Sequence, residues 1–223
     1  MVRICKMKER SLLEEKKDWT KRAILNAAKR VFFQKGYLNT TINEIATRAR
    51  VSNGAIYLYF KSKDDLYLSL MMPVLEEFGQ ALNDLERKLK DDPQMNGRTL
   101  IMGFLEVFKR VYRYDPDGIR IVQTFQIGNL TSKMTEETGQ EIISCAKRNR
   151  KVARNIISKA IKMNLFNKTN PAKLFDVLSG TFFGILQLEE SKLRATQKNY
   201  IFSTLEYAYL CLADHFCTGR NRS

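Results

Sequence analysis

Apolar residues early in the chain recur at intervals of three and four positions, which is the spacing of one face of an α-helix. They are Ile24, Ala27, Ala28, Val31 and Phe32. The stripe starts after Trp19, and Gly36 follows it at the kind of position where glycine commonly ends a helix. Residues 1–18 are charged and lack this periodicity, so we expect an N-terminal arm or a frayed extension of the first helix.

Two short helices are predicted next. Thr41 with Glu44 three positions later forms a capping box, in which each side chain accepts a hydrogen bond from the other residue's backbone N–H group. The apolar face of this second helix consists of Ile42, Ile45, Ala46 and Ala49. Residues 49–51 are predicted to form a tight turn, and Ser52 can cap a third helix that runs through Tyr59.

The remainder of the chain is also predicted to be helical. Ser62 and Asp65 have the spacing of a second capping box, which predicts a long fourth helix that continues past Leu70. Later segments of helical spacing are separated by breaks near residues 91–97, 114–118, 128–132, 164–171 and 194–196. No segment alternates as a strand does and no internal repeat is present, so the sequence predicts an all-α protein.

Three short helices with one tight turn, followed at once by a long helix, are typical of a helix-turn-helix, here at about residues 41–60. The predicted domains are therefore residues 1–70, which include this motif and the basic arm at 1–18, and a larger helical domain at 71–223.

Positive charge is concentrated in the first of these domains. The chain has a formal net charge of +14, and residues 1–63 contain 15 lysines and arginines against 5 aspartates and glutamates. The remaining 160 residues contain 23 against 19. A basic module beside a nearly neutral one is typical of a protein that binds a polyanion, because solubility alone gives no reason to localise the charge.

Other features narrow the class of protein. The four cysteines, Cys5, Cys145, Cys211 and Cys217, lack the spacing of metal ligands or of a disulfide framework, which indicates free thiols in a reducing cytoplasm. We therefore expect neither a metal nor a cofactor. The N-terminus has no apolar segment of a signal peptide, and no window approaches eighteen apolar residues, so we expect a cytoplasmic protein without a membrane partner.

The N-terminal sequence resembles the tetracycline-repressor (TetR) family. The resemblance runs through residues 22–37, TTINEIA at 40–46, VSNGAIYLYF at 51–60 and KSKDDL at 61–66, in the family's order and spacing. It covers about a quarter of the chain. It implies a homodimeric transcriptional repressor that binds a palindromic operator and is released by a ligand bound in the second domain.

One residue departs from the family's pattern. The family commonly has glycine in the turn before the third helix, where this chain has Arg50. If that position needs a positive φ, a residue other than glycine costs about 1–3 kcal/mol there. Either the turn has a different shape, or the arginine is tolerated because it contacts a DNA phosphate.

The third helix carries side chains suited to contacts with DNA bases. Asn53 and Tyr57 can donate hydrogen bonds, whereas Gly54 and Ala55 allow the backbone to approach base edges and thymine methyl groups. The predicted contact residues at this helix are Ser52, Asn53, Gly54, Ala55 and Tyr57. The opposite side, with Val51, Ile56 and Phe60, is predicted to be core.

Phosphate contacts are expected to fix the protein's register on the duplex. Thr40 or Thr41 offers hydroxyl and N–H groups at the second helix. The resemblance places Tyr59 and Lys63 on phosphates, and Lys61 is a further candidate. Alternatively, Tyr37 and Tyr57 are structural and the lysines form a solvated face. Lys6, Lys8 and Arg10 of the arm either reach neighbouring phosphates or play no part.

The resemblance implies a homodimer formed by the last two long helices, at about residues 171–193 and 197–216. Gly180 and Gly184 lie four apart on the first of these, so a helix of the partner can approach closely there. The alternative is that they pack within their own subunit.

The resemblance also implies a ligand pocket in the second domain, and an apolar or aromatic ligand would suit the residues available. The candidates are Phe78, Met102, Phe104, Phe108, Tyr112, Phe125 and Phe183, with Thr124, Gln126 and Gln187 as polar contacts. The alternative for each is an ordinary core position.

Other functions have less support. His215 is the only histidine, and the chain lacks a phosphate-binding glycine loop and a serine-elbow motif, so we do not expect an enzyme. A ligand-independent DNA-binding or architectural protein would not require so large a second domain. An activator rather than a repressor stays open.

Overall fold

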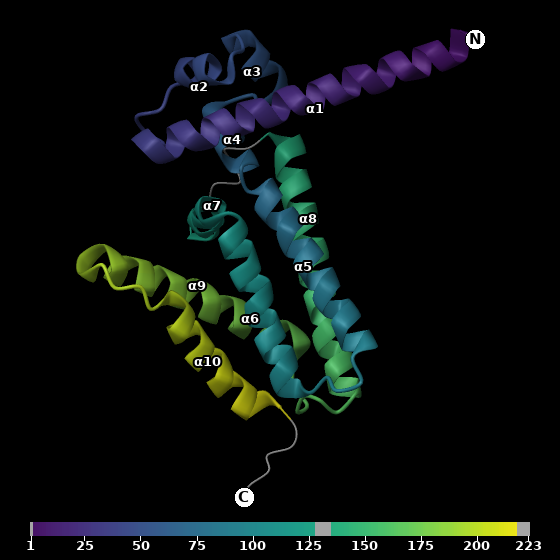
Figure 1. Cartoon of the computed structure of the whole chain (residues 1–223), viewed down its shortest axis with the longest axis vertical. Coiled ribbons are helices and arrows are strands. Elements are labelled where there is room, and N and C mark those ends of the chain that lie inside the picture. The colour runs from purple at the N-terminus through teal and green to yellow at the C-terminus, as the bar shows by residue number, and fades with distance from the viewer. Residues whose placement is uncertain (1, 128–134, 218–223) are drawn as a thin grey trace, which may run out of the picture. The chain divides into compact units, whose positions relative to one another are not determined.

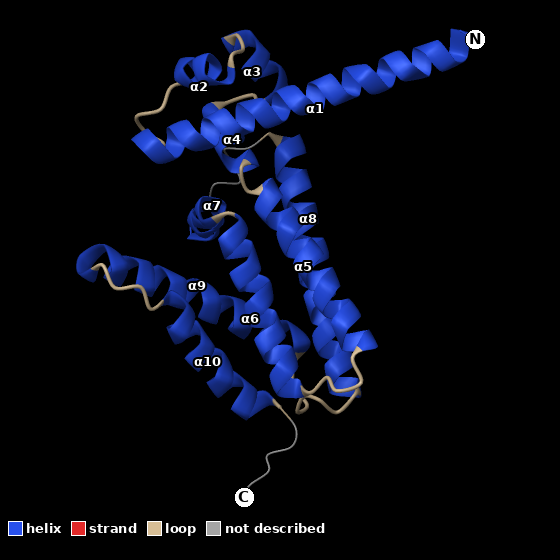
Figure 2. Ribbon diagram, in the orientation of Figure 1, coloured by secondary structure: helices blue, strands red, loops and turns tan. Residues whose placement is uncertain are grey.

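The computed structural model describes residues 2–127 and 135–217, with side chains from residue 14 onward except those of 126 and 127. In these ranges the chain forms helices and no β-strand, and one isolated backbone bridge joins Phe166 to Cys217 (Figure 2). The all-α prediction is confirmed. The helices are α1 Val2–Lys35, α2 Ile42–Ala49, α3 Asn53–Tyr59, α4 Lys63–Ser69, α5 Met72–Asp91, α6 Gly97–Tyr114, α7 Pro116–Ile127, α8 Glu136–Lys162, α9 Pro171–Thr196 and α10 Ile201–Phe216.

The chain divides into two compact units, one made of Met1–Met72 with Thr124–Ile142 and the other of Pro73–Gln123 with Ile143–Ser223. In the first unit, α1 packs against α2 and α4, and α2 packs against α3 (Figure 1). Its core consists of apolar side chains that include Ile24, Ala28, Ile45, Ile56, Phe60 and Leu66. Ile56 and Phe60 are buried as predicted, whereas Val51 is half-buried.

Helix α1 begins at Val2, so the predicted arm is a continuation of the first helix. The described side chains of residues 14–19 are all exposed, which explains why this segment has no apolar stripe. The side chains of Lys6, Lys8 and Arg10 lie outside the described part of the chain.

The prediction of one long fourth helix is wrong, because α4 ends at Ser69 and α5 begins at Met72. The N–H groups of Leu70 and Met71 donate to Tyr67 and Leu68, three residues back instead of four. Pro73 follows directly. Proline has no N–H to donate, and its ring would clash with the carbonyl of Ser69 in a continuous helix.

The second predicted capping box is half formed. Ser62 Oγ accepts a hydrogen bond of 3.0 Å from the N–H of Asp65, as predicted. The Asp65 carboxylate, however, accepts from the N–H of Lys61 at 3.0 Å and from the Thr135 hydroxyl at 3.3 Å. These donors compensate for burying a charged side chain that is only 1% exposed.

In the second unit, α6 packs against α9 and α10, and α9 packs against α10. The hydroxyl of Tyr209 on α10 is buried and donates 2.7 Å to the carbonyl of Leu178 on α9. Helices α5 and α8 are joined by Asn149 Nδ2, which donates 2.6 Å to the carbonyl of Leu75. Gly79 allows this approach, since a Cβ there would meet Asn149 Oδ1 at 2.6 Å. The break predicted at 194–196 lies at 197–200 instead, where Gln197 has φ 58° and ends α9.

Candidate nucleic-acid interface

Helix α2 begins with the predicted capping box. Thr41 Oγ1 accepts from the N–H of Glu44 at 3.3 Å, and the Glu44 carboxylate accepts from the N–H of Thr41 at 2.9 Å. Lys35 forms an ion pair with Glu44, and this pairing, together with the bonds from Thr41, lowers the pKa of Glu44 to about 2. The box does not use the N–H groups of Ile42 and Asn43, so these are the candidate anion donors at this helix end.

Thr40 and Thr41 differ in orientation. The Thr40 side chain is 2% exposed, and its hydroxyl donates 2.8 Å to the carbonyl of Gly36. Thr41 is exposed. Burial therefore favours Thr41 over Thr40 as the phosphate contact, and that contact stays a prediction.

The turn between α2 and α3 has a left-handed residue at Arg50, with φ 58° and ψ 41°. The N–H of Arg50 donates to the carbonyl of Thr47 at 3.2 Å, and the N–H of Val51 donates to the carbonyl of Ala46 at 3.0 Å. This pair of bonds is a Schellman motif, which usually has glycine at the left-handed position. A differently shaped turn, one of the two expected explanations for Arg50, is therefore wrong.

Helix α3 presents most of the predicted base contacts to solvent. Ser52 Oγ accepts from the N–H of Ala55 at 3.1 Å, which fixes the start of the helix. Asn53, Gly54 and Tyr57 are exposed, and Ala55 is half-buried. A Cβ on Gly54 would meet only Ser52 Oγ, at 3.8 Å, so the backbone is open to a partner there.

Helix α3 also exposes a residue that was not predicted as a contact. Leu58 is 80% exposed. The helical spacing from Ile56 and Phe60, which are core, indicates an outward position for it, but its apolar character did not suggest a DNA contact.

The predicted phosphate residues have different surroundings. Lys61 is exposed and Tyr59 is half-buried. Lys63 Nζ donates to the carbonyls of Tyr37 at 2.9 Å and Thr40 at 3.0 Å. An ammonium group has three N–H bonds, so one of them is left for a phosphate.

Tyr37 is a structural residue of the first unit, which is the alternative role predicted for it. Its hydroxyl donates 2.6 Å to Asp64 Oδ1, and its ring lies 4.9 Å from the ring of Tyr67 and 5.8 Å from that of Phe32. Lys63 Nζ lies 4.4 Å from the centre of the Tyr37 ring, in cation–π geometry. Burial, followed by the neighbouring Asp64 carboxylate, raises the pKa of Tyr37 well above its ordinary value.

Several of the predicted ligand residues are aromatic side chains that contact one another or Phe182. Phe78 and Phe108 lie 5.3 Å apart between ring centres, and Phe108 stacks on Phe182 at 4.8 Å. Phe183 contacts Phe182 at 5.3 Å. These rings form an aromatic cluster in the second unit, in which Phe108 and Phe182 are buried and Phe78 and Phe183 are half-buried.

Three other candidates in the second unit have different surroundings. Phe104 is fully buried and Gln187 is exposed. The hydroxyl of Tyr112 donates 3.2 Å to Glu190, which also pairs with Arg120 at 3.1 Å. Burial and the Glu190 charge raise the pKa of Tyr112.

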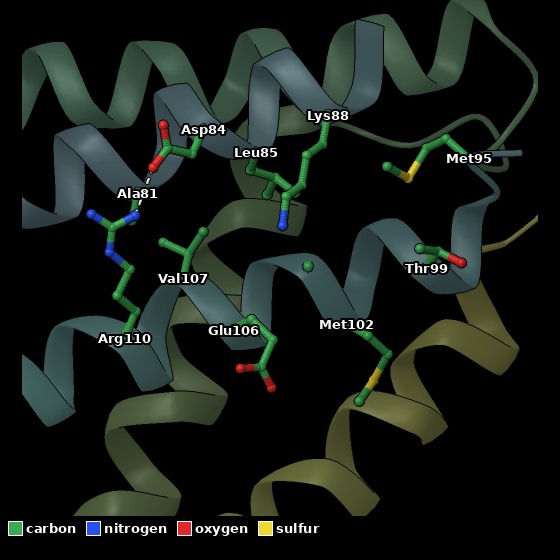
Figure 3. A pocket seen from close by; sticks show the side chains of 11 residues that line it. Ala81, Asp84, Leu85, Lys88, Met95, Thr99, Met102, Glu106, Val107 and Arg110 are labelled. Atoms are coloured by element: carbon green, nitrogen blue, oxygen red, sulfur yellow. Dashed lines mark hydrogen bonds and ion pairs between the residues drawn. The ribbon is translucent and has the colours of Figure 1, made fainter. Parts of the chain in front are cut away.

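Met102 lines a groove of about 330 Å³ between α5 and α6 (Figure 3). Leu85 and Val107 contribute to its apolar lining, and Arg110 pairs at its rim with Asp84 at 2.6 Å. Thr124 and Phe125 belong to the first unit, and the side chain of Gln126 is outside the described residues. The ligand site therefore stays a prediction.

Helix α9 has an exposed, largely apolar face. Val177 and Leu188 are exposed, as are Gly180 and Gly184 between them. A Cβ on either glycine would meet nothing within 4 Å, so the alternative of close packing within the subunit is wrong.

No helix among the described residues is long and apolar enough to cross a membrane. The same residues contain no group of three or more His, Cys, Asp or Glu side chains placed to hold a metal ion.

The first unit, with a capped α2, a left-handed turn and a solvent-facing α3, defines a helix-turn-helix protein. More particularly, the model of the family described as bacterial regulatory proteins, tetR family, matches residues 24–70 of this chain.

The chain is also similar to individual curated proteins. The chain is similar to the fatty acid metabolism regulator protein of Bacillus subtilis (strain 168), with 38% identity over 68 residues, 30% of this chain and 34% of that protein. The alignments cover between 29% and 40% of the first three curated relatives, so the chain matches less than half of their length.

Solved structures extend the likeness of fold to most of the chain. A regulatory protein in the tetR family from Rhodococcus RHA1 has a TM-score of 0.64 and 19% identity, covering 90% of this chain and 98% of that one. FadR from Bacillus subtilis, solved in complex with stearoyl-CoA, has a TM-score of 0.58 and 21% identity, covering 86% and 96%.

Proposed function

We propose that the protein is a sequence-specific transcriptional repressor that binds a palindromic operator as a homodimer. A small, largely apolar ligand bound by the helical second domain, at about residues 71–223, releases it. The observation that carries the proposal is the exposed face of α3, held beside α2 by the cap at Ser52 and the turn at Arg50. A helix presented in this way fits the major groove.

Charge supports DNA as the partner. Residues 1–63 have three times as many basic as acidic side chains. Each phosphate that a lysine or arginine neutralises releases a counterion, so affinity should fall steeply as salt rises.

A dimer is proposed because one module of this size buries too little surface for tight, specific binding. The exposed face of α9 with Gly180 and Gly184 suits such an interface, because bare backbone allows a second helix to approach closely. Helix α10 exposes Tyr207 and is proposed to complete a four-helix interface with the partner.

The effector releases the protein from DNA if it binds more tightly to the conformer that does not bind DNA. The free energy that couples ligand binding to DNA binding in this way is usually about 1–3 kcal/mol. Stearoyl-CoA is a rational first probe because it is bound by FadR, whose fold this chain shares. We further propose that the protein is not an enzyme and acts in the cytoplasm, where its DNA partner would lie.

The deciding experiment selects random duplex DNA against the purified full chain near physiological salt. An enriched palindrome with half-sites about one helical turn apart is expected. Binding that fades with salt and shows no sequence preference would contradict the proposal. Addition of stearoyl-CoA to the complex then tests release, and operator binding that no acyl-CoA or other apolar ligand changes would support a ligand-independent DNA-binding protein instead.

A further inference from the structure

Leu58 lies on α3 with 80% of its side chain exposed, although leucine is usually buried. Its neighbour two positions earlier, Ile56, is completely buried in the core of the first unit. Exposure of Leu58 therefore does not follow from poor packing of the helix. It follows from the position of this residue on the helix surface.

An α-helix turns by about 100° per residue, which places Leu58 about 200° around the axis from Ile56. Gly54, one turn earlier, is only about 40° from Leu58 around the axis and about 6 Å along it. The line of α3 that faces away from the core thus contains Gly54, which has no side chain, followed by Leu58, which has an apolar one. Asn53 and Tyr57 lie together on one side of this line, between Gly54 and Ile56 around the helix axis.

The proposed partner of α3 has one apolar group at the major-groove edge of its bases, the 5-methyl group of thymine. The bare backbone at Gly54 removes the steric obstacle to close approach, since a Cβ there would touch only Ser52 Oγ. Leu58, one turn further along α3, would then enter the same groove.

We propose that Leu58 is a specificity-determining residue that packs on the methyl group of a thymine in each operator half-site. The proposal rests on the proposed function, because it requires that α3 enters the major groove. It assigns part of the base recognition to an apolar contact instead of a hydrogen bond.

The test replaces each thymine of the selected operator by deoxyuridine, which lacks only the 5-methyl group, and measures the Kd of the full-length protein. One position per half-site should weaken binding by the wild type about fourfold, which corresponds to about 0.8 kcal/mol for one buried methyl group. In Leu58→Ala the same replacement should change Kd by less than about 1.5-fold. Leu58→Met, which keeps an apolar side chain, should restore most of the effect.

Leu38→Ala is the matched control, because Leu38 is also strongly exposed, at 87%, but lies in the loop before α2. It should keep the full response to deoxyuridine. Thermal unfolding of each variant checks that the first unit is intact, and an exposed helical leucine is expected to tolerate alanine.

The outcomes separate the two proposals. An enriched operator whose deoxyuridine response is absent, or is the same in wild type and Leu58→Ala, overturns the role of Leu58 and leaves the proposed function standing. Selection without any enriched sequence overturns the proposed function and this role together.

Discussion

The hydroxyl of Tyr37 donates a 2.6 Å hydrogen bond to Asp64 Oδ1 and so joins the loop after α1 to the first turn of α4. Lys63, the neighbour of Asp64, binds the carbonyl of Tyr37 at 2.9 Å. Two consecutive residues of α4 thus hold the same loop residue, one through its side chain and one through its backbone. This loop leads into α2, so the pair positions the helix-turn-helix.

Tyr37→Phe removes the bond to Asp64 and keeps the ring contacts. The free energy of unfolding should fall by about 1 kcal/mol, the usual net contribution of one hydrogen bond. Urea denaturation measures this change. Tyr114→Phe is the control, because Tyr114 is exposed. An equal loss of unfolding free energy in both variants would show that the bond to Asp64 does not stabilise the fold.

Arg50→Gly separates the backbone strain at the left-handed position from a contact of the arginine side chain with a DNA phosphate. Glycine adopts a positive φ without strain, so the free energy of unfolding should rise by about 1 kcal/mol. If the arginine contacts a phosphate, the same variant should bind operator DNA more weakly and with a salt slope smaller by about one. Higher stability with unchanged DNA binding would exclude the phosphate contact.

Glu44→Gln should make the stability of the fold less dependent on pH in the acidic range. The folded protein holds the pKa of Glu44 at about 2 against its ordinary 4.5, so the ionised carboxylate stabilises the fold above about pH 4.5. That contribution is lost as pH falls toward about 2. The difference in Tm between wild type and variant should therefore be largest near neutral pH and vanish near pH 2. A difference that does not vary with pH would contradict this assignment.

Asn53→Ala and Tyr59→Phe should affect DNA binding differently. Asn53 is exposed on α3, and its loss should relax the sequence preference at one or two positions of each half-site. Tyr59→Phe should weaken binding to all sequences alike, since a phosphate contact carries no base information. Binding to a library of operator variants distinguishes these patterns, and unchanged preference in Asn53→Ala would refute its role.

Gly184→Leu tests the proposed dimer interface. A leucine has open space on the isolated subunit and a better helix propensity than glycine, so the fold of the subunit should be preserved or strengthened. The dimer should nevertheless dissociate at protein concentrations at which the wild type stays associated, as measured by light scattering. An unaffected dimer would place the interface elsewhere.

The sequence predicted most of the helix-turn-helix because its signals are local. The caps at Thr41 and Ser52 act within three residues, and the structure has both. The break before α5 was missed because Pro73 fits the first turn of a new helix as well as it interrupts an old one. Leu58 was missed because apolar character was equated with core.

The ligand site was less predictable. Helical spacing gives the face of each helix but not which faces converge, so neither the contact between Phe78 and Phe108 nor the bond from Tyr112 to Glu190 could be predicted. The groove beside Met102 depends on the distance between α5 and α6, which no local pattern encodes.

The bond from Thr135 to Asp65 has a consequence for protein engineering. It brings a residue from the middle of the chain to a carboxylate in the N-terminal quarter, and the first compact unit includes both segments. A chimera that transfers only residues 1–72 to another scaffold would leave the buried Asp65 without one of its donors. Transfer of residues 124–142 as well should give a more stable graft, because the first compact unit is discontinuous in sequence.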